Sequence, residues 1–171
     1  DDVVESYDPI YKVNPPLRTA VDVAAVRAGL ADGTINIVAT DHAPHPAEAK
    51  ECEWQEAAFG MLGLESALAI VNQVMVTTGL MTWEAVADRM SYSPARIGRY
   101  EGHGQKIAIG NQANLTVINP TQTLRVDRDL VASRSRNTPF HGMELQGVVA
   151  ATIYRGHPTL LNGKLSATGE R

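Results

Sequence analysis

The sequence predicts an α/β fold followed by a smaller β-rich unit, and three observations support this prediction. An extended candidate, a helical stretch and an uninterrupted apolar run follow one another over residues 10–40, which is the order of a βαβ unit. More helical stretches follow before residue 100. Beyond it, glycine-rich punctuation separates short runs of apolar and β-branched residues. We therefore place a boundary near Tyr100, with the α/β part over 1–100 and the β-rich part over 101–171.

Residues 10–40 contain the extended segments of the βαβ unit. Ile10–Val13 is a short extended candidate, and the two prolines that follow Asn14 forbid helix and push that residue toward extended geometry. Ile35–Thr40 is a short apolar run without polar alternation. Such a run is typical of a parallel strand buried on both faces, so we expect the second strand of the unit here.

Between these segments, residues 19–33 predict an α-helix. Thr19 is a typical N-cap, Asp22 stands three residues further on as in a capping box, and Gly33 marks the expected end. The apolar residues at helical spacing, which we expect to form the buried face, are Val23, Val26 and Leu30.

Three more helical stretches are predicted before the boundary. Glu53–Thr78 is expected to be mostly helical. Thr82 is expected to cap the next helix, and Ser93 with Pro94 to open a short one that ends by Gly98. The side chains expected to face inward are Leu64, Leu68, Val71 and Met75 in the first stretch, and Trp83, Val86 and Met90 in the second.

The β-rich part is expected to consist of short strands joined by tight turns. The predicted strands are Lys106–Ile109, Asn114–Ile118, Val148–Tyr154 and Thr159–Leu161. Asn162-Gly163 closes the last of them and is the dipeptide preferred in two-residue hairpin turns.

Composition limits the classes of partner. Hydrophobic residues make up 44% of the chain and charged residues 20%, as in soluble globular proteins. The net charge of −4 gives no basic surface, so we expect no nucleic acid and no membrane as a partner. The single cysteine, Cys52, rules out an intramolecular disulfide, which makes the cytoplasm the expected location. The start, DDVVESYDP, resembles no signal peptide, and we expect that residue 1 does not begin the natural protein.

The stretch INIVATDHAPHP at 35–46 ends an apolar run in one carboxylate and two imidazoles. In folds built from parallel strands, sites lie at the carboxyl ends of the strands, which is where Asp41 stands. A carboxylate there can ligate a metal, act as a general base, or do both. An aspartate before a proline-containing turn is also often a loop cap, so both interpretations stay open.

The two histidines after Asp41 are expected to differ in role. Alternation along the strand places Asp41 and His42 on opposite faces, and we expect a hydrogen-bonded structural role for His42. His45 stands in the following loop and can reach a ligand. A catalytic zinc needs about three protein ligands, and the chain contains neither HxH nor HExxH. Either Asp41 binds no metal, or the missing ligands lie outside this chain.

Six stretches of the chain resemble a known family. They are KVNPPLR at 12–18, VATDHAPH at 38–45, AFGMLGLE at 58–65, YSPARIG at 92–98, GNQANLTVINP at 110–120 and SRSRNTPFHGMELQG at 133–147. Together they resemble the carboxyl-terminal part of the bacterial class I dihydroorotases, of the amidohydrolase superfamily. The pairing of NPPLR with TDHAPH is the specific part of the resemblance, whereas GNQANLTVI is generic to amidohydrolases.

The resemblance implies a fold and a reaction. The fold is a distorted TIM-like (β/α)8 barrel with a small β-sandwich, of which residues 1–100 would hold the last two barrel strands with their helices, and 101–171 the carboxyl-terminal sandwich strands. The reaction is the reversible cyclisation of N-carbamoyl-L-aspartate to dihydroorotate in pyrimidine biosynthesis. Family members use zinc hydroxide to attack the ring amide carbonyl, with one or two zinc ions as the cofactor.

The resemblance also implies roles for single residues. Asp41 matches the aspartate that contacts the metal and acts as general acid and base. Asn14 and His45 match substrate-binding positions, and Phe59 and Gly60 match a loop whose backbone meets the pyrimidine ring. The other metal ligands of the family would lie upstream of residue 1, so we expect this chain alone to be an inactive fragment.

Partners and rival functions are also implied. We expect a small-molecule substrate and a homo-oligomer, with aspartate transcarbamoylase as the candidate partner enzyme. One rival is a cyclic amidohydrolase of the hydantoinase or allantoinase type. Another is a non-catalytic homologue that scaffolds aspartate transcarbamoylase, although the presence of Asp41, Asn14 and His45 argues against such decay.

Overall fold

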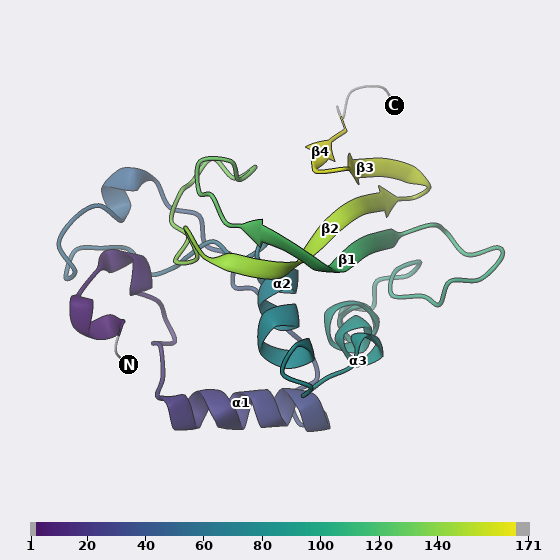
Figure 1. Ribbon diagram of the computed structural model, residues 1–171, viewed down its shortest axis with the longest axis horizontal. Helices are drawn as coiled ribbons and strands as arrows, with labels where there is room; N and C mark the ends of the chain where they lie inside the picture. Colours follow the sequence, from purple (N-terminus) through teal and green to yellow (C-terminus); the bar gives the residue numbers. More distant parts are fainter. Residues whose placement is uncertain (1–2, 167–171) are drawn as a thin grey trace.

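A computed structural model describes residues 3–166 of the chain. Helices occupy the first hundred residues and an antiparallel sheet the remainder (Figure 1). The α-helices are α1 (Ala20–Asp32), α2 (Ala67–Val71), α3 (Trp83–Ala87) and α4 (Ser93–Gly98). The π-helical segments η4 (Asn72–Val76) and η5 (Asp88–Tyr92) continue α2 and α3, and three short 3-10 helices are η1 (Val4–Ser6), η2 (Pro9–Tyr11) and η3 (Ala47–Ala49). No helix among these residues is both long and apolar enough to cross a membrane.

The sheet contains four strands in the order β1-β2-β3-β4, each antiparallel to its neighbour. Their bounds are β1 (Leu115–Arg125), β2 (Glu144–Tyr154), β3 (His157–Leu161) and β4 (Lys164–Leu165). The ladder between β1 and β2 is irregular between Asn119 and Thr123, where Pro120 lacks a backbone donor. At the other end Leu161 pairs with Lys164 across a two-residue turn. The predicted hairpin at Asn162-Gly163 is therefore confirmed, with the positive φ angles of 48° and 74° that such a turn requires.

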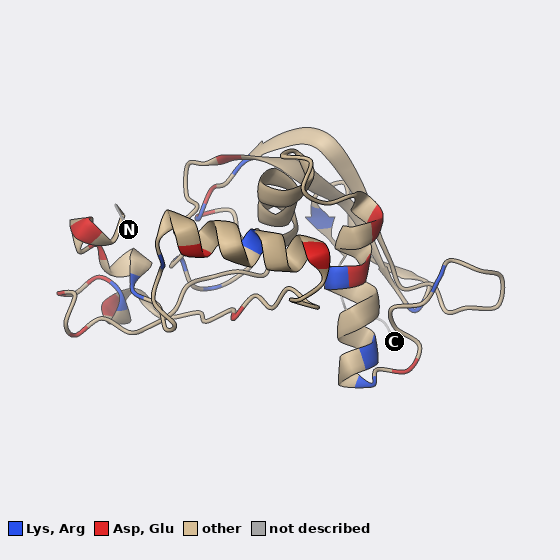
Figure 2. Cartoon of the chain, turned by 90° about the horizontal axis from the view of Figure 1, so that it is seen from below, with Lys and Arg blue, Asp and Glu red and all other residues tan. Residues whose placement is uncertain are grey.

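Helix α1 begins and ends where the sequence predicts. The Thr19 side chain accepts a hydrogen bond from the Asp22 amide, the Asp22 carboxylate accepts one from the Thr19 amide, and Gly33 ends the helix in the left-handed region. The expected buried face is wrong in part, because Val23 and Val26 are exposed and Leu30 alone is buried. The helix runs along one side of the molecule (Figures 1 and 2), and only its last turn reaches the core.

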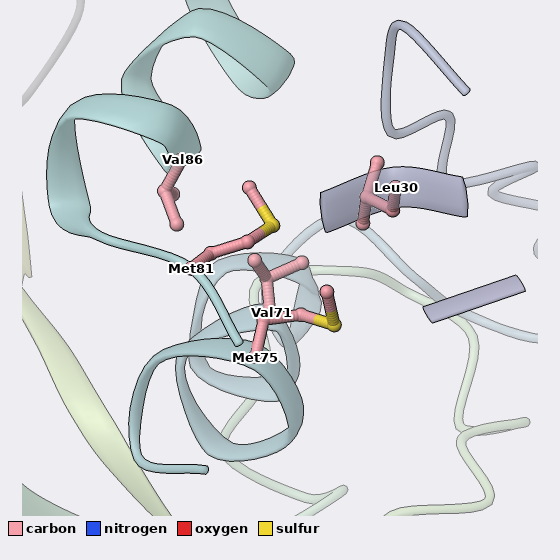
Figure 3. Close-up of a cluster of buried hydrophobic side chains, with 5 residues drawn as sticks. All are labelled: Leu30, Val71, Met75, Met81 and Val86. Carbon is pink, nitrogen blue, oxygen red and sulfur yellow. The ribbon is translucent and has the colours of Figure 1, made fainter. Parts of the chain in front are cut away.

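The core lies where the end of α1 meets the α2–η4 and α3–η5 segments (Figure 3). Its buried members are Leu30, Val71, Met75, Met81 and Val86. The predictions for Val71, Met75 and Val86 are confirmed, and Leu68, Trp83 and Met90 pack against the cluster. Full burial of such a side chain is worth about 1.5–3 kcal/mol.

Asn72, at the start of η4, joins the helices to the sheet. Its side chain is 1% exposed and donates to the carbonyl of Gln146 at 2.9 Å and to that of Pro120 at 3.2 Å. Gly147 provides the space, because a Cβ there would lie 3.0–3.3 Å from the Asn72 side chain. The junction thus satisfies a buried amide and fixes the sheet over α2.

Two expected strands of the βαβ unit are not formed among residues 3–166. Pro9–Tyr11 is a 3-10 helix instead of an extended segment, because the Asp8 side chain caps it by accepting from the Ile10 amide at 2.9 Å. Residues 35–40 belong to no strand. Parallel pairing among these residues is limited to one bridge between His42 and Met61. Parallel strands are normally buried on both faces, whereas Ile35 and Ala39 are exposed here.

Two further expectations are wrong. Helix over 53–66 is absent, because Gly60 adopts a φ of 135° that interrupts any helix, and α2 begins at Ala67. Leu64 is accordingly exposed. Residues 106–109 form no strand and project into solvent, with Ile107 86% exposed. The expected helices at 83 and 93 are confirmed, the first capped by the Thr82 hydroxyl, which accepts from the Ala85 amide.

Candidate functional site

Three segments that carry the candidate residues lie side by side. His42 forms the parallel bridge to Met61, and the Ala43 amide donates to the Met61 carbonyl at 3.0 Å. The Gly60 amide donates to the carbonyl of Lys12 at 3.0 Å. The loop after Asp41, the loop at 59–61 and the segment that leads to Asn14 therefore meet at one place, where Figure 1 shows the purple and blue parts of the chain together.

Asp41 has an unusual backbone conformation. Its φ is 45°, in the left-handed region that non-glycine residues enter at a cost, although aspartate is among the tolerated types. The residue is exposed, and no hydrogen bond or ion pair within residues 3–166 engages its carboxylate. The loop-cap interpretation therefore has no hydrogen bond to support it in this part of the chain. Residues held in sparsely populated conformations cluster at functional sites.

His42 has the structural role expected from the sequence. Its Nδ1 accepts hydrogen bonds from the amides of Gly63 at 3.1 Å and Leu64 at 3.3 Å. Because Nδ1 is the acceptor, the neutral ring carries its proton on Nε2. The imidazole thus fixes the turn that precedes α2.

His45 is joined to the loop that carries Phe59. Its Nε2 lies 2.9 Å from the Phe59 carbonyl oxygen, and because a carbonyl only accepts, Nε2 is the donor. The half-buried ring lines a cleft of about 340 Å³ together with Lys50, Arg136 and His141. His45, Phe59 and Gly60 were each predicted as substrate contacts, and the structure brings these three residues together.

Gly60 is required for this contact. A Cβ at this position would lie 2.5 Å from the Ala43 Cβ and 3.0 Å from His45 Nε2, and its φ of 135° is rare for any other residue. The Phe59 side chain is exposed. Asn14 is exposed as well, two residues beyond the Lys12 carbonyl that holds Gly60, and it precedes a cis peptide bond to Pro15.

Asn137 is a site residue that single-residue reasoning missed. Its side chain is buried, accepts from the His45 amide at 3.2 Å and donates to the carbonyls of Ala43 at 2.9 Å and Gly60 at 3.3 Å. Its own carbonyl accepts from the Leu62 amide at 3.0 Å. Its signal in the sequence is its position in SRSRNTPFHGMELQG, one of the stretches on which the resemblance rests.

A catalytic zinc ion needs about three protein ligands. No group of three or more histidine, cysteine, aspartate or glutamate side chains gathers within residues 3–166. Asp41 offers an exposed carboxylate without a protein partner in that range, which suits one oxygen ligand of a zinc ion. The described residues therefore fit a metal site to which this part of the chain contributes one ligand, the carboxylate of Asp41.

The model of the amidohydrolase family matches residues 13–159. The chain belongs to the amidohydrolase family.

Within that family the chain is similar to dihydroorotases. It is 58% identical over 166 residues to the dihydroorotase of Streptomyces coelicolor, covering 97% of this chain and 39% of that protein. It is 52% identical to the dihydroorotase of Leifsonia xyli and 49% identical to that of Mycobacterium tuberculosis, covering 95% of this chain in each case and 37% and 38% of those proteins. The chain thus spans less than two fifths of the length of these curated relatives.

Solved structures agree on the fold. The L-hydantoinase (dihydropyrimidinase) of Arthrobacter aurescens superimposes with a TM-score of 0.89 at 30% identity, over 97% of this chain and 38% of that one. The D-hydantoinase of a Thermus species gives a TM-score of 0.79 at 23% identity, over 92% and 35%, and shows the fold alone. The expected fold class, part of a TIM-like barrel with an attached β domain, is confirmed. The division at residue 100 stays a prediction.

Proposed function

We propose that this chain is the carboxyl-terminal part of a dihydroorotase, which reversibly cyclises N-carbamoyl-L-aspartate to dihydroorotate. Identities of 49–58% to three dihydroorotases support the substrate. The structural observation that supports the site is the exposed carboxylate of Asp41, whose backbone is in the left-handed region four residues before His45, the residue that contacts the Phe59 carbonyl.

In this proposal Asp41 moves the protons. Its carboxylate would be one ligand of one or two zinc ions, which would supply Lewis-acid activation of water and of the substrate carbonyl. In the hydrolytic direction the carboxylate accepts the proton of the attacking water and delivers it to the leaving ring nitrogen. Exposure suits this role, since no side chain within residues 3–166 competes for the carboxylate oxygens.

The remaining candidate residues bind and orient the substrate. The side-chain amide of Asn14 both donates and accepts, which suits an amide or carboxylate. His45 keeps its Nδ1 free to accept while Nε2 holds the Phe59 carbonyl, and Phe59 with Gly60 offers backbone groups to the pyrimidine ring. The proposal also includes a small-molecule substrate and a cytoplasmic location. It further includes assembly into a homo-oligomer and association with aspartate transcarbamoylase.

A hydantoinase-type activity is the second candidate, favoured by the superposition on the Arthrobacter aurescens L-hydantoinase. The test is turnover by the full-length protein with dihydroorotate, hydantoin and allantoin at equal concentrations. We expect the kcat/KM for dihydroorotate to exceed the other two by at least a hundredfold. A preference for hydantoin or allantoin would contradict the proposal, and absence of turnover with all three substrates would favour a non-catalytic scaffold of aspartate transcarbamoylase.

A further inference from the structure

Two buried lysines lie beneath the loop that carries Phe59. Lys12 is 8% exposed and Lys50 is 6% exposed. A buried ammonium is costly unless hydrogen bonds replace its water, and buried lysines are usually paired with an acid. Within residues 3–166, no carboxylate lies within ion-pair distance of either ammonium. Their partners are backbone carbonyls instead.

Lys12 holds the loop in three ways. Its Nζ donates to the carbonyl of Trp54 at 2.7 Å and to that of Gln55 at 3.0 Å. The same Nζ lies 4.6 Å from the centroid of the Phe59 ring, within the range of a cation–π contact. The carbonyl of Lys12 accepts from the Gly60 amide at 3.0 Å. One residue therefore binds both the beginning of the loop and its functional end.

Lys50 makes a second group of hydrogen bonds to the same segment. Its Nζ donates to the carbonyl of Ala58 at 3.0 Å and to that of Lys12 at 3.3 Å. Ala58 is also tied back, since its amide donates to the Ala49 carbonyl at 2.9 Å. Hydrogen bonds from an ammonium are stronger than neutral ones, so these contacts hold the 50–60 segment closed on the Lys12 backbone.

We propose that Lys12 and Lys50, the lysine pair, are positioning residues that hold the 50–60 segment so that Phe59 and Gly60 keep their place against His45 when substrate binds. The inference rests on the proposed function for the identity of the substrate, and on geometry alone for the loop. It assigns to the lysine pair a role that neither the carboxylate nor the imidazoles of the site supply.

The first experiment measures loop order without substrate. In the full-length protein, Lys12→Met and Lys50→Met keep the aliphatic stem and remove the ammonium. We expect amide hydrogen exchange of a peptide spanning 50–62 to become at least tenfold faster in each variant, while a peptide from the core at 71–86 stays unchanged. Lys106→Met is the matched control, because Lys106 is exposed and its side chain is remote from the loop. Unchanged exchange over 50–62 in both variants would overturn the proposal.

The second experiment measures what the loop does for the substrate. We expect the KM for dihydroorotate to rise about tenfold with kcat within threefold of wild type, which indicates the loss of binding that the ground state and the transition state share. The double variant should lose no more than the larger single effect, because both lysines act on one segment. A fall in kcat at constant KM would overturn the positioning role.

A third measurement needs no variant and tests the premise that both ammonium groups are buried and hydrogen-bonded in the folded protein. Reductive methylation of the wild-type protein should label Lys106 and Lys164 at least tenfold faster than Lys12 and Lys50. Equal labelling of all four lysines would overturn the proposal. If wild type fails to turn over dihydroorotate, the proposed function is wrong, whereas the hydrogen-exchange result still decides whether the lysine pair holds the loop.

Discussion

The side chain of Asn137 accepts a hydrogen bond from the backbone amide of His45 at 3.2 Å, across 92 residues of sequence. The same side chain donates to Ala43 and Gly60, so it joins the two loops of the candidate site. Asn137 lies between β1 and β2, in the β-rich part of the chain. That part of the chain therefore supports the candidate site structurally, through the Asn137 side chain.

Replacement of Asn137 by aspartate should destabilise the protein. A carboxylate cannot donate to the carbonyls of Ala43 and Gly60, and unsatisfied buried groups cost about 1–3 kcal/mol each. We expect a loss of about 2–4 kcal/mol in the free energy of unfolding, measured by urea denaturation of the full-length protein. Asn111→Asp, at an exposed position, is the control and should change the value by less than about 0.5 kcal/mol.

Asp41→Asn should abolish turnover of dihydroorotate by the full-length enzyme and leave its fold intact. The amide keeps the shape of the side chain but neither accepts a proton at neutral pH nor ligates zinc as a carboxylate does. We expect kcat to fall at least a thousandfold with an unchanged melting temperature, because no described side chain depends on the carboxylate. Activity within tenfold of wild type would refute the assigned role. Glu48→Gln, an exposed acid in η3, should retain activity.

Gly60→Ala and Gly79→Ala separate steric overlap from backbone strain. Both glycines have a positive φ, of 135° and 76°, but a Cβ at Gly60 would lie 2.5 Å from Ala43 whereas a Cβ at Gly79 meets nothing within 4 Å. We expect Gly79→Ala to cost about 1 kcal/mol from conformation alone. Gly60→Ala should cost about 2–4 kcal/mol, since overlap adds to strain. Equal losses of unfolding free energy in the two variants, measured by chemical denaturation, would show that the loop moves to accommodate the Cβ at residue 60 without additional cost.

Lys50 predicts a pH dependence of stability. Burial lowers the pKa of its ammonium, the charge of Lys12 lowers it further, and Asp8 and Cys52 act weakly in the opposite direction. Between that lowered pKa and the ordinary value of 10.5, the unfolded chain binds more protons than the folded one. The free energy of unfolding therefore rises with pH in this window.

Lys50→Met removes this pH dependence and serves as the comparison. We expect the stability of wild type relative to Lys50→Met to increase as the pH is raised toward 10.5, and to be lowest below the folded-state pKa of Lys50. Chemical denaturation of both proteins across the alkaline range checks this expectation. A difference in unfolding free energy that is independent of pH would show that the ammonium is not desolvated.

Features set by neighbours in the sequence were predicted well. The capping box of Thr19, the left-handed Gly33, the cap at Thr82 and the Asn162-Gly163 turn all appear as expected. Each depends on hydrogen bonds or backbone angles within about five residues, which the local sequence encodes. The apolar spacing that identified Val71, Met75 and Val86 as core depends on the same short-range periodicity.

The sequence alone thus determined the caps, the turns and the core positions Val71, Met75 and Val86. Through the stretches that resemble a family, it also determined the candidate site residues. Tertiary structure decided the rest. Residues 35–40 have strand composition but pair with no strand, and residues 53–66 follow a helical pattern that the approach of Gly60 to Ala43 prevents. The partners of Asn137, Lys12 and Lys50 are backbone carbonyls, which every residue possesses, so no pattern of side chains could reveal these contacts before the chain was folded.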